Sequence, residues 1–150
     1  MSAKRWITLC CLILVGAGSA ATLAAPVAGD AAARSVFEAR FATFNRHDLD
    51  ALVALYAPDA VLTSPGFCQD RVGLAGARQA YSALFQGVPD IKDEVTAVII
   101  DRDHIAVQFI ARSVRPGAAF TVRIANFLTL DHGLIKRDDA YYDAKGRPCS

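Results

Sequence analysis

A polar side chain in the second half of the sequence falls on a strand face that is otherwise apolar. Residues 118–130 alternate in a way that predicts a strand, and Asn126 takes the phase of the apolar positions. The apolar residues that share this phase are Phe120, Val122, Ile124, Leu128 and Leu130. A buried amide is costly unless it is hydrogen-bonded, and its nitrogen can donate to a carbonyl oxygen. We expect Asn126 either to polarise an oxygen of a bound molecule or to bond to neighbouring backbone in the core.

Two adjacent carboxylates, Asp138 and Asp139, stand near the end of the chain. They lie in residues 134–143, a second alternating stretch, and therefore point to opposite faces of a predicted strand. Tyr142 shares the face of Asp138, and Tyr141 shares the other. A carboxylate that is desolvated in an apolar site has a raised pKa, which suits it to proton transfer near neutral pH. The alternative is a charged strand face exposed to water or to a dimer partner.

Four further side chains carry groups that can contact a polar ligand atom. Arg40 stands at the edge of an apolar stripe on a predicted helix, where its guanidinium can reach an anionic or carbonyl group. An exposed or salt-bridged arginine is the alternative. Tyr56, Tyr81 and Tyr141 each supply a phenolic donor, although buried tyrosines more often serve in packing. We keep all four as candidate ligand-binding residues.

The elements that must position these residues follow the order helix, helix, short strand, helix and four long strands. The helices are predicted over residues 31–46, 49–56 and 74–86, the short strand over 60–64, and the long strands over 91–100, 104–114, 118–130 and 134–143. Asp30 and Asp48 are the predicted N-caps of the first two helices, and Pro58 ends the second. Short connections make the sheet largely antiparallel. The sequence therefore predicts an α+β domain with its helices on one face of the sheet.

The first residues have the pattern of a secretory signal peptide. A basic start and an apolar run over residues 6–15 precede a stretch of small residues, and no acidic residue appears before Asp30. We expect a signal peptide over residues 1–24 and a mature domain over 25–150, secreted or periplasmic. The alternative is an uncleaved anchor, since residues 6–25 are just long enough to span a bilayer. Only in that case do we expect a membrane as a partner.

Two cysteines remain in the predicted mature domain, Cys68 and Cys149. In an oxidising compartment an even pair favours a disulfide, which stabilises the fold by restricting the unfolded chain. Two independent buried thiols are the alternative. A zinc site is not expected, because neither a CxxC nor an HxxxH spacing occurs.

Composition and the remaining motifs exclude several classes of protein. The chain has 150 residues, 53% of them hydrophobic, which fits one folded domain rather than a disordered chain. Lys plus Arg total 16 against 15 for Asp plus Glu, so the net charge gives no reason to expect a nucleic-acid partner. The sequence has no Ser-His-Asp string, glycine-rich phosphate loop or nucleic-acid motif. We expect no cofactor and no metal ion.

Several short strings of the sequence occur in an order that is typical of a known superfamily. They are residues 47–61 (HDLDALVALYAPDAV), Ser64-Pro65-Gly66 followed by Gly73, residues 131–135 (DHGLI) and residues 141–143 (YYD). Together they resemble the nuclear transport factor 2-like superfamily, especially its SnoaL-like and ketosteroid isomerase branches. The resemblance covers roughly residues 31–143, the core of the predicted domain.

This resemblance implies a cone in which a curved, mainly antiparallel sheet wraps around three helices. Such a sheet leaves an apolar hollow at its open end, which suits a small hydrophobic molecule. The resemblance also implies roles for three residues. Asn126 matches the protonated carboxylic acid in the oxyanion hole of the ketosteroid isomerases. SnoaL-like cyclases use an aspartate on a pocket strand as acid or base, which implies that role for Asp138 or Asp139.

The sequence departs from the ketosteroid isomerase pattern at two positions. Ser64 stands where those enzymes have the aspartate that moves the proton, and Arg40 stands where they have a tyrosine. A serine hydroxyl has far too high a pKa to act as that base unaided. Ordinary ketosteroid isomerase activity is therefore not expected. Ser64 is either a candidate ligand-binding residue or a polar residue at a strand end.

The expected function is that of an exported SnoaL-like protein that binds a small hydrophobic molecule with a carbonyl or hydroxyl group. If the protein is catalytic, we expect cofactor-free proton transfer, as in an isomerase, cyclase or hydratase. The resemblance also implies a homodimer. The alternative is a non-catalytic binding or dimerisation module. Its cone would be filled by Phe41, Phe44, Phe109, Phe120 and Phe127.

Overall fold

The computed structural model describes residues 28–145 and Cys149. The predicted signal peptide, residues 1–24, lies outside the described residues, so its cleavage stays a prediction. Within residues 28–145, no helix is both long enough and apolar enough to cross a membrane.

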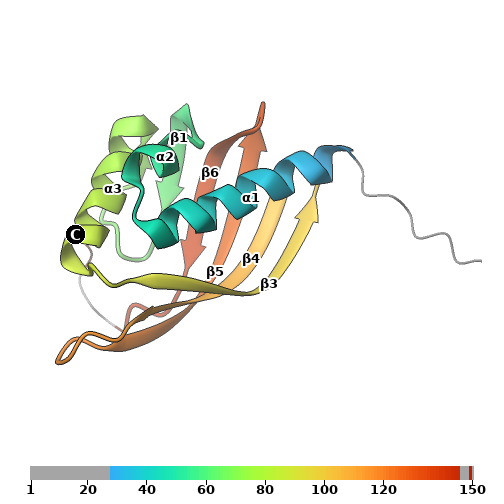
Figure 1. Cartoon of the computed structure of the whole chain (residues 1–150). Helices are drawn as coiled ribbons and strands as arrows, with labels where there is room; N and C mark the ends of the chain where they lie inside the picture. The colour runs from blue at the N-terminus through green and yellow to red at the C-terminus, as the bar shows by residue number, and fades with distance from the viewer. Residues whose placement is uncertain (1–27, 146–148, 150) are drawn as a thin grey trace, which may run out of the picture.

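Within the described part of the chain, three helices cover one face of a curved sheet (Figure 1). They are α1 (Ala28–Arg46), α2 (Leu49–Val53) and α3 (Gly73–Gly87). The predicted apolar stripe of α1 is buried at Phe37, Phe41 and Phe44. The Phe41 ring contacts an aromatic ring of the sheet, and the Phe44 ring contacts aromatic rings of α3. This stripe joins the helical layer to the sheet.

The strands of residues 28–145 are β1 (Tyr56–Thr63), β2 (Arg71–Val72), β3 (Lys92–Asp101), β4 (His104–Ser113), β5 (Phe120–Asp131) and β6 (Leu134–Tyr141). They form one six-stranded sheet in the order β2–β1–β6–β5–β4–β3. The pairing of β1 with β6 is parallel, and the other neighbouring pairs are antiparallel. The predicted α+β class, with a largely antiparallel sheet around three helices, is confirmed.

The boundary between α2 and β1 differs from the prediction. The sequence predicts a helix through Tyr56 and a strand from residue 60, whereas α2 ends at Val53 and β1 begins at Tyr56. Tyr56 already pairs with Ile135 of β6, so the sheet takes up residues that the sequence assigns to the helix. Pro58 is tolerated inside β1 because it lies where the pairing with β6 shifts register.

One of the two predicted helix caps is present. The Asp48 carboxylate caps α2 by accepting a hydrogen bond from the backbone N–H of Ala51 at 3.1 Å. Asp30 does not cap α1, because the helix begins at Ala28 and Asp30 lies in its first turn. The Asp30 carboxylate instead accepts a hydrogen bond from the backbone N–H of Arg102 at 2.8 Å. This bond holds the start of α1 against the turn after β3.

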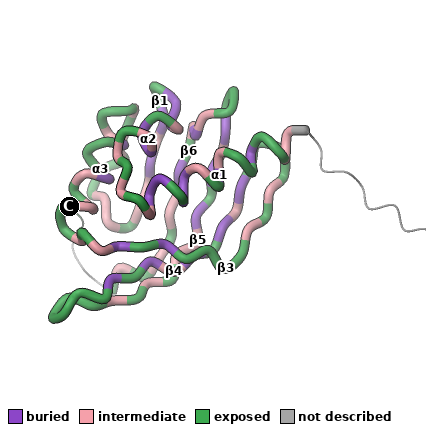
Figure 2. Tube along the Cα trace, in the orientation of Figure 1, coloured by how far each residue is buried: buried purple, intermediate pink, exposed green. Residues whose placement is uncertain are grey.

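The two faces of the sheet differ in burial (Figure 2). Along β4, buried positions alternate with less buried ones, as expected for a strand with one face toward the core. The buried residues of β4 include Ile105, Val107, Phe109 and Ala111. On the outer face, Phe127 of β5 is exposed. The core therefore lies between the helices and the concave face.

The structure contains the expected disulfide between Cys68 and Cys149. Cys68 belongs to the loop that follows β1, and Cys149 belongs to the segment that follows β6. The bond joins positions that are 81 residues apart in the sequence.

Candidate functional site

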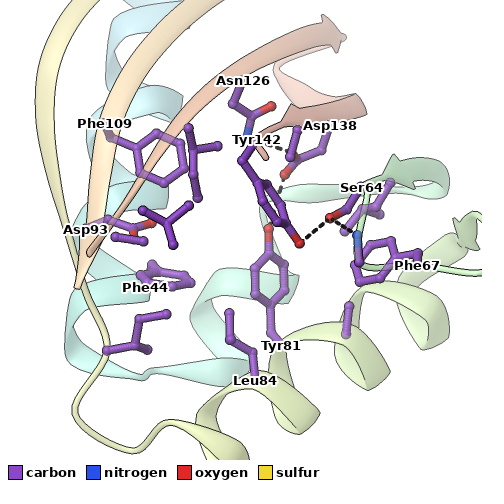
Figure 3. Close-up of a pocket in the computed structure, with 18 of the residues that line it drawn as sticks. Phe44, Ser64, Phe67, Tyr81, Leu84, Asp93, Phe109, Asn126, Asp138 and Tyr142 are labelled. Carbon is purple, nitrogen blue, oxygen red and sulfur yellow. Dashed lines mark hydrogen bonds between the residues drawn. The ribbon is translucent and has the colours of Figure 1, made fainter. Parts of the chain in front are cut away.

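A cavity of about 430 Å³ lies between the concave face of the sheet, α1, α3 and the segment after β1 (Figure 3). Most of its lining residues are apolar, which suits a small hydrophobic molecule. Its aromatic lining residues are Phe44, Phe67, Tyr81, Phe109, Phe120 and Tyr142. These rings line the hollow without filling it. Phe127, one of the rings expected in a filled cone, contacts Tyr141 on the outer face of the sheet instead.

Polar side chains meet at the buried end of this cavity, with Asp138 at their centre. Its Oδ2 atom accepts hydrogen bonds from the hydroxyls of Tyr56 at 2.5 Å and Tyr81 at 3.1 Å. The same atom pairs with Nη2 of Arg40 at 3.4 Å. Its Oδ1 atom accepts a hydrogen bond from Nδ2 of Asn126 at 2.8 Å. Because Asp138 is only 4% exposed, these four donors take the place of water around the carboxylate.

Each member of this cluster comes from a different element. They are Arg40 of α1, Tyr56 of β1, Tyr81 of α3, Asn126 of β5 and Asp138 of β6. Strand pairing explains why Asp138 faces inward, because its partners Leu62 on β1 and Leu128 on β5 are both buried. The cluster is thus a product of tertiary structure and not of a local motif.

Burial fixes the protonation of the two tyrosines in the cluster. It raises the pKa of the Tyr56 and Tyr81 hydroxyls above the ordinary value of 10.0, and the adjacent Asp138 carboxylate adds to this rise. Both hydroxyls therefore keep their protons at neutral pH and can act as donors. The Arg40 guanidinium lies over the Phe41 ring at 4.8 Å. Its Nε and Nη1 atoms are buried and have no hydrogen-bond partner among the described residues.

A second carboxyl group, that of Asp93 on β3, also lines the cavity, and its surroundings are different. Asp93 is 7% exposed, and its Oδ1 atom has no hydrogen-bond partner among the described residues. Burial raises the pKa of Asp93 to about 7, although the Arg40 guanidinium opposes the rise and the Asp138 carboxylate adds to it. This group can therefore gain and lose a proton near neutral pH.

The side chain of Asn45, near the end of α1, holds the backbone of Asp93. Its amide nitrogen donates to the Asp93 carbonyl oxygen at 2.8 Å, and its amide oxygen accepts from the Asp93 N–H at 2.8 Å. Two hydrogen bonds to one residue fix its backbone at the start of β3. The Asp93 side chain then points into the cavity (Figure 3).

The structure divides the residues that the sequence singles out between the cavity and the other face of β6. The cavity wall contains Arg40, Ser64, Tyr81, Asn126 and Asp138. Tyr56 is buried against Asp138 but is not part of the wall. Ser64 donates a hydrogen bond to the hydroxyl oxygen of Tyr142 at 3.3 Å.

Asp139 and Tyr141 lie on the outer face of β6 and do not reach the cavity. The Asp139 carboxylate accepts a hydrogen bond from Oγ1 of Thr63 at 2.9 Å and pairs with Arg137 at 2.8 Å. Tyr141 is 57% exposed and contacts Phe127. Of the two adjacent carboxylates that the sequence leaves open, Asp138 is the one in the cavity wall.

Comparison with known protein families places this fold. The sequence matches the profile of the SnoaL-like domain over residues 22–138, most of the chain. The chain belongs to the SnoaL-like domain family. A comparison with curated proteins finds no match for it.

Solved structures similar to this SnoaL-like chain share its fold. A putative polyketide cyclase from Sinorhizobium meliloti has 22% identity and a TM-score of 0.61, with 71% of this chain and 94% of that one covered. SalBIII, described as an epoxide hydrolase/cyclase-like enzyme in pyran ring formation, has 18% identity and a TM-score of 0.67, covering 75% and 92%. TerC, co-crystallised with polyporic acid, has 16% identity and a TM-score of 0.68, covering 76% and 93%.

Two cavity residues of this SnoaL-like chain, Asp93 and Tyr142, are not among the candidates from the sequence. For Asp93 a signal was available, because it shares its alternation phase with Ile91 and Val95. A polar residue on an otherwise apolar strand face is the same signal that identifies Asn126. Tyr142 shares the phase of Asp138, which puts it on the same side of the strand.

Proposed function

We propose that this protein binds a small hydrophobic molecule bearing a carbonyl or hydroxyl group, and that it moves a proton on this molecule without a cofactor. The observation that carries the proposal is Asp93, a carboxyl group in an apolar cavity whose pKa is about 7. A general acid or base works best when its pKa lies near the working pH.

The size and lining of the cavity support a hydrophobic ligand. A volume of about 430 Å³ lies within the usual range for small-molecule pockets. The names of the similar structures also support small-molecule chemistry, since they include a polyketide cyclase, an enzyme of pyran ring formation and a complex with polyporic acid. A hollow that is not filled by aromatic rings favours a binding site over a purely structural module.

In the proposed reaction, Asp93 is the group that carries the proton. Its carboxylate takes a proton from the carbon next to the ligand carbonyl, the C–H bond breaks, and the electron pair moves to the carbonyl oxygen to give an enolate. Asp93 then returns the proton and the C=O bond re-forms: return to the same carbon restores the ketone, and in a ligand whose C=C bond is conjugated with the enolate, return to the far carbon of the dienolate completes an isomerisation. The developing negative charge needs donors that are already in place.

Arg40 and Asn126 are the proposed donors to that oxygen. Arg40 has two nitrogen atoms without a partner among the described residues. The Asn126 amide nitrogen gives one hydrogen to Asp138 and has a second one to donate. Asp138 is assigned the role of holding this donor set, because its four hydrogen-bonding contacts leave it less free than Asp93.

Hydrogen–deuterium exchange of a simple ketone tests this proposal. We expect the wild-type protein to accelerate exchange of the α-protons of 1-indanone in D₂O near neutral pH, followed by NMR. Asp93→Asn should lower the protein-dependent rate by a factor of about 100 or more, as expected for loss of a general base. Glu94→Gln is the matched control, because Glu94 is the exposed neighbour of Asp93 and pairs with Arg112.

Binding of 1-indanone is measured in parallel by calorimetry. Binding without accelerated exchange in the wild type would contradict catalysis on simple ketones and favour the non-catalytic binding module. Equal exchange rates in Asp93→Asn and wild type would reject the role of Asp93. Loss of exchange with binding retained in Asp93→Asn is the expected result.

A further inference from the structure

Tyr142 occupies an unusual position in the cavity. It is the first residue after β6, it is half-buried, and its ring lies among the cavity side chains (Figure 3). Strand pairing gives its place along the cavity, because Asp138 pairs with Leu128 and Ala140 pairs with Asn126. Tyr142 therefore comes one strand repeat beyond Asn126, in the direction away from Asp138.

The cavity changes character along this direction. At the Asp138 end the wall contains polar side chains, and the strand partners of Asp138 are fully buried. Further along β5 and β6 the wall contains the half-buried residues Phe120 and Ala144, and the loop after β1 adds the half-buried Phe67. A ligand whose oxygen binds at the polar end and whose apolar part extends along β6 would contact the Tyr142 ring.

Contacts from the loop after β1 hold the Tyr142 hydroxyl in place. Ser64 Oγ donates to it at 3.3 Å, and Ser64 Oγ in turn accepts from the backbone N–H of Gly66 at 3.2 Å. A Cβ atom at position 66 would lie 2.6 Å from this hydroxyl oxygen, so a larger residue there would displace the tyrosine. The absence of a side chain at Gly66 thus makes room for the hydroxyl of Tyr142.

The disulfide connects the same two parts of the chain. Cys68 follows the loop residues that contact Tyr142, and Cys149 follows Tyr142 itself. Ser64 and Gly66 on one segment and Tyr142 on the other are therefore linked both by the hydrogen bond and by the covalent bond.

We propose that Tyr142 is the residue that determines how large an apolar group the ligand can carry beyond its polar end. This inference rests on the proposed ligand-binding function, and it adds a size limit that the function itself does not require. Ser64 and Gly66 act as positioning elements for the ring.

A series of 4-alkylphenols, from 4-ethylphenol to 4-octylphenol, measures this limit by calorimetry on the purified protein with its disulfide intact. Each methylene group that enters an apolar site strengthens binding about fourfold. For the wild type we expect this gain to stop at a certain chain length, where the alkyl chain meets the Tyr142 ring. For Tyr142→Ala the gain should continue to longer chains, so that the longest phenols bind at least about tenfold more tightly than to wild type.

Two substitutions of graded size protect the test against a folding defect in Tyr142→Ala. In Tyr142→Leu the chain length at which the gain in affinity stops should increase, but less than in Tyr142→Ala. In Tyr142→Trp this chain length should decrease. Tyr141→Ala is the matched control, because Tyr141 is the neighbouring tyrosine on the outer face of β6, and the limit should stay at its wild-type length.

The outcomes separate this inference from the function on which it rests. If wild type binds the phenols but the limit is the same in all Tyr142 variants, the size role of Tyr142 is wrong and ligand binding stands. If neither wild type nor Tyr142→Ala binds any phenol, both the binding function and the inference are overturned. A limit that moves equally in Tyr141→Ala would also reject the role of Tyr142.

Discussion

Asp93 and Asp138 have the same side chain and line the same cavity, but their surroundings are opposite. Asp138 accepts hydrogen bonds or an ion pair from Arg40, Tyr56, Tyr81 and Asn126. Asp93 has a carboxyl oxygen without any partner among the described residues, and burial raises its pKa to about 7. One carboxyl group is held as part of a polar cluster, and the other can exchange a proton.

The difference shows that neighbouring groups, and not residue type, decide how each of the two carboxyl groups is held. Pairs of titratable groups in contrasting environments are a common arrangement in enzymes that transfer protons. Here α1 contributes to both environments, since Arg40 pairs with Asp138 and Asn45 holds the backbone of Asp93. The negative charge of Asp138 is therefore expected to stabilise the fold, and the negative charge of Asp93 to destabilise it.

The largest effect is expected at Asp138. Asp138→Asn removes the charge that pairs with Arg40 and leaves the buried guanidinium without its salt-bridge partner. Breaking a buried ion pair in this way costs about 3–5 kcal/mol of folding free energy. Urea unfolding at pH 7 measures the loss. Asp139→Asn, in a more exposed pair with Arg137, should cost less than about 1 kcal/mol. Equal losses of folding free energy in Asp138→Asn and Asp139→Asn would show that the buried Asp138 pair contributes no more than the exposed Asp139 pair.

The next effect is the loss of folding stability that we expect when Asp93 ionises at high pH. Between the ordinary pKa of 3.8 and about 7, folded Asp93 holds a proton that the unfolded chain releases. Stability conferred by the protonated form is therefore lost as pH rises through this range. We therefore compare the free energy of unfolding of wild type with that of Asp93→Asn. The difference, wild type minus variant, should be lower at pH 8 than at pH 4, by ~4 kcal/mol at most.

Urea unfolding of both proteins from pH 4 to pH 8 measures this difference. Asp93→Asn also introduces a buried amide, but that cost is the same at every pH and cancels when the two curves are compared. Curves that stay parallel over the whole range would show that Asp93 has an ordinary pKa in the folded protein.

A smaller effect is expected when the Asp138 cluster is weakened by one donor. Tyr56→Phe removes the hydroxyl that lies 2.5 Å from Asp138 Oδ2. Hydrogen bonds to charged groups contribute about 1.5–3 kcal/mol, so the variant should lose roughly that much stability. Tyr141→Phe, at an exposed position, should unfold at the same urea concentration as wild type. No loss in Tyr56→Phe would mean that Tyr81 and Asn126 suffice to hold Asp138.

Much of the fold follows from local patterns in the sequence. Alternation identifies the four long strands, and the apolar stripe of α1 identifies the helix that packs on them. The start of β1 does not follow from such patterns, because Pro58 stops a helix in the sequence but in the structure belongs to a strand that pairs with β6. Pairing over a long sequence distance decides that boundary, and local propensity cannot anticipate it.

The candidate site is predictable only in part, for a related reason. Alternation places Asn126 and Asp138 on inner faces, and both line the cavity. It cannot bring Arg40, Tyr56 and Tyr81 together around Asp138, because those contacts come from helices and strands distant in sequence. The phase that Asp93 shares with Ile91 and Val95 is the inner one only at the start of β3, because the strand phase changes at the register shift between Val95 and Ala97. Beyond that shift, apolar Ile99 faces outward and is exposed.

The parallel pairing of β1 with β6 has a consequence for the order in which the chain can fold during synthesis. β1 lies in the first half of the described residues and β6 near their end, so a ribosome must complete the last strand before this pair can form. Until then, the Tyr56 hydroxyl lacks the Asp138 carboxylate to which it donates a hydrogen bond, and one edge of β1 stays unpaired. A product that stops before β6 also lacks Asp138, the carboxylate at which the buried polar side chains meet.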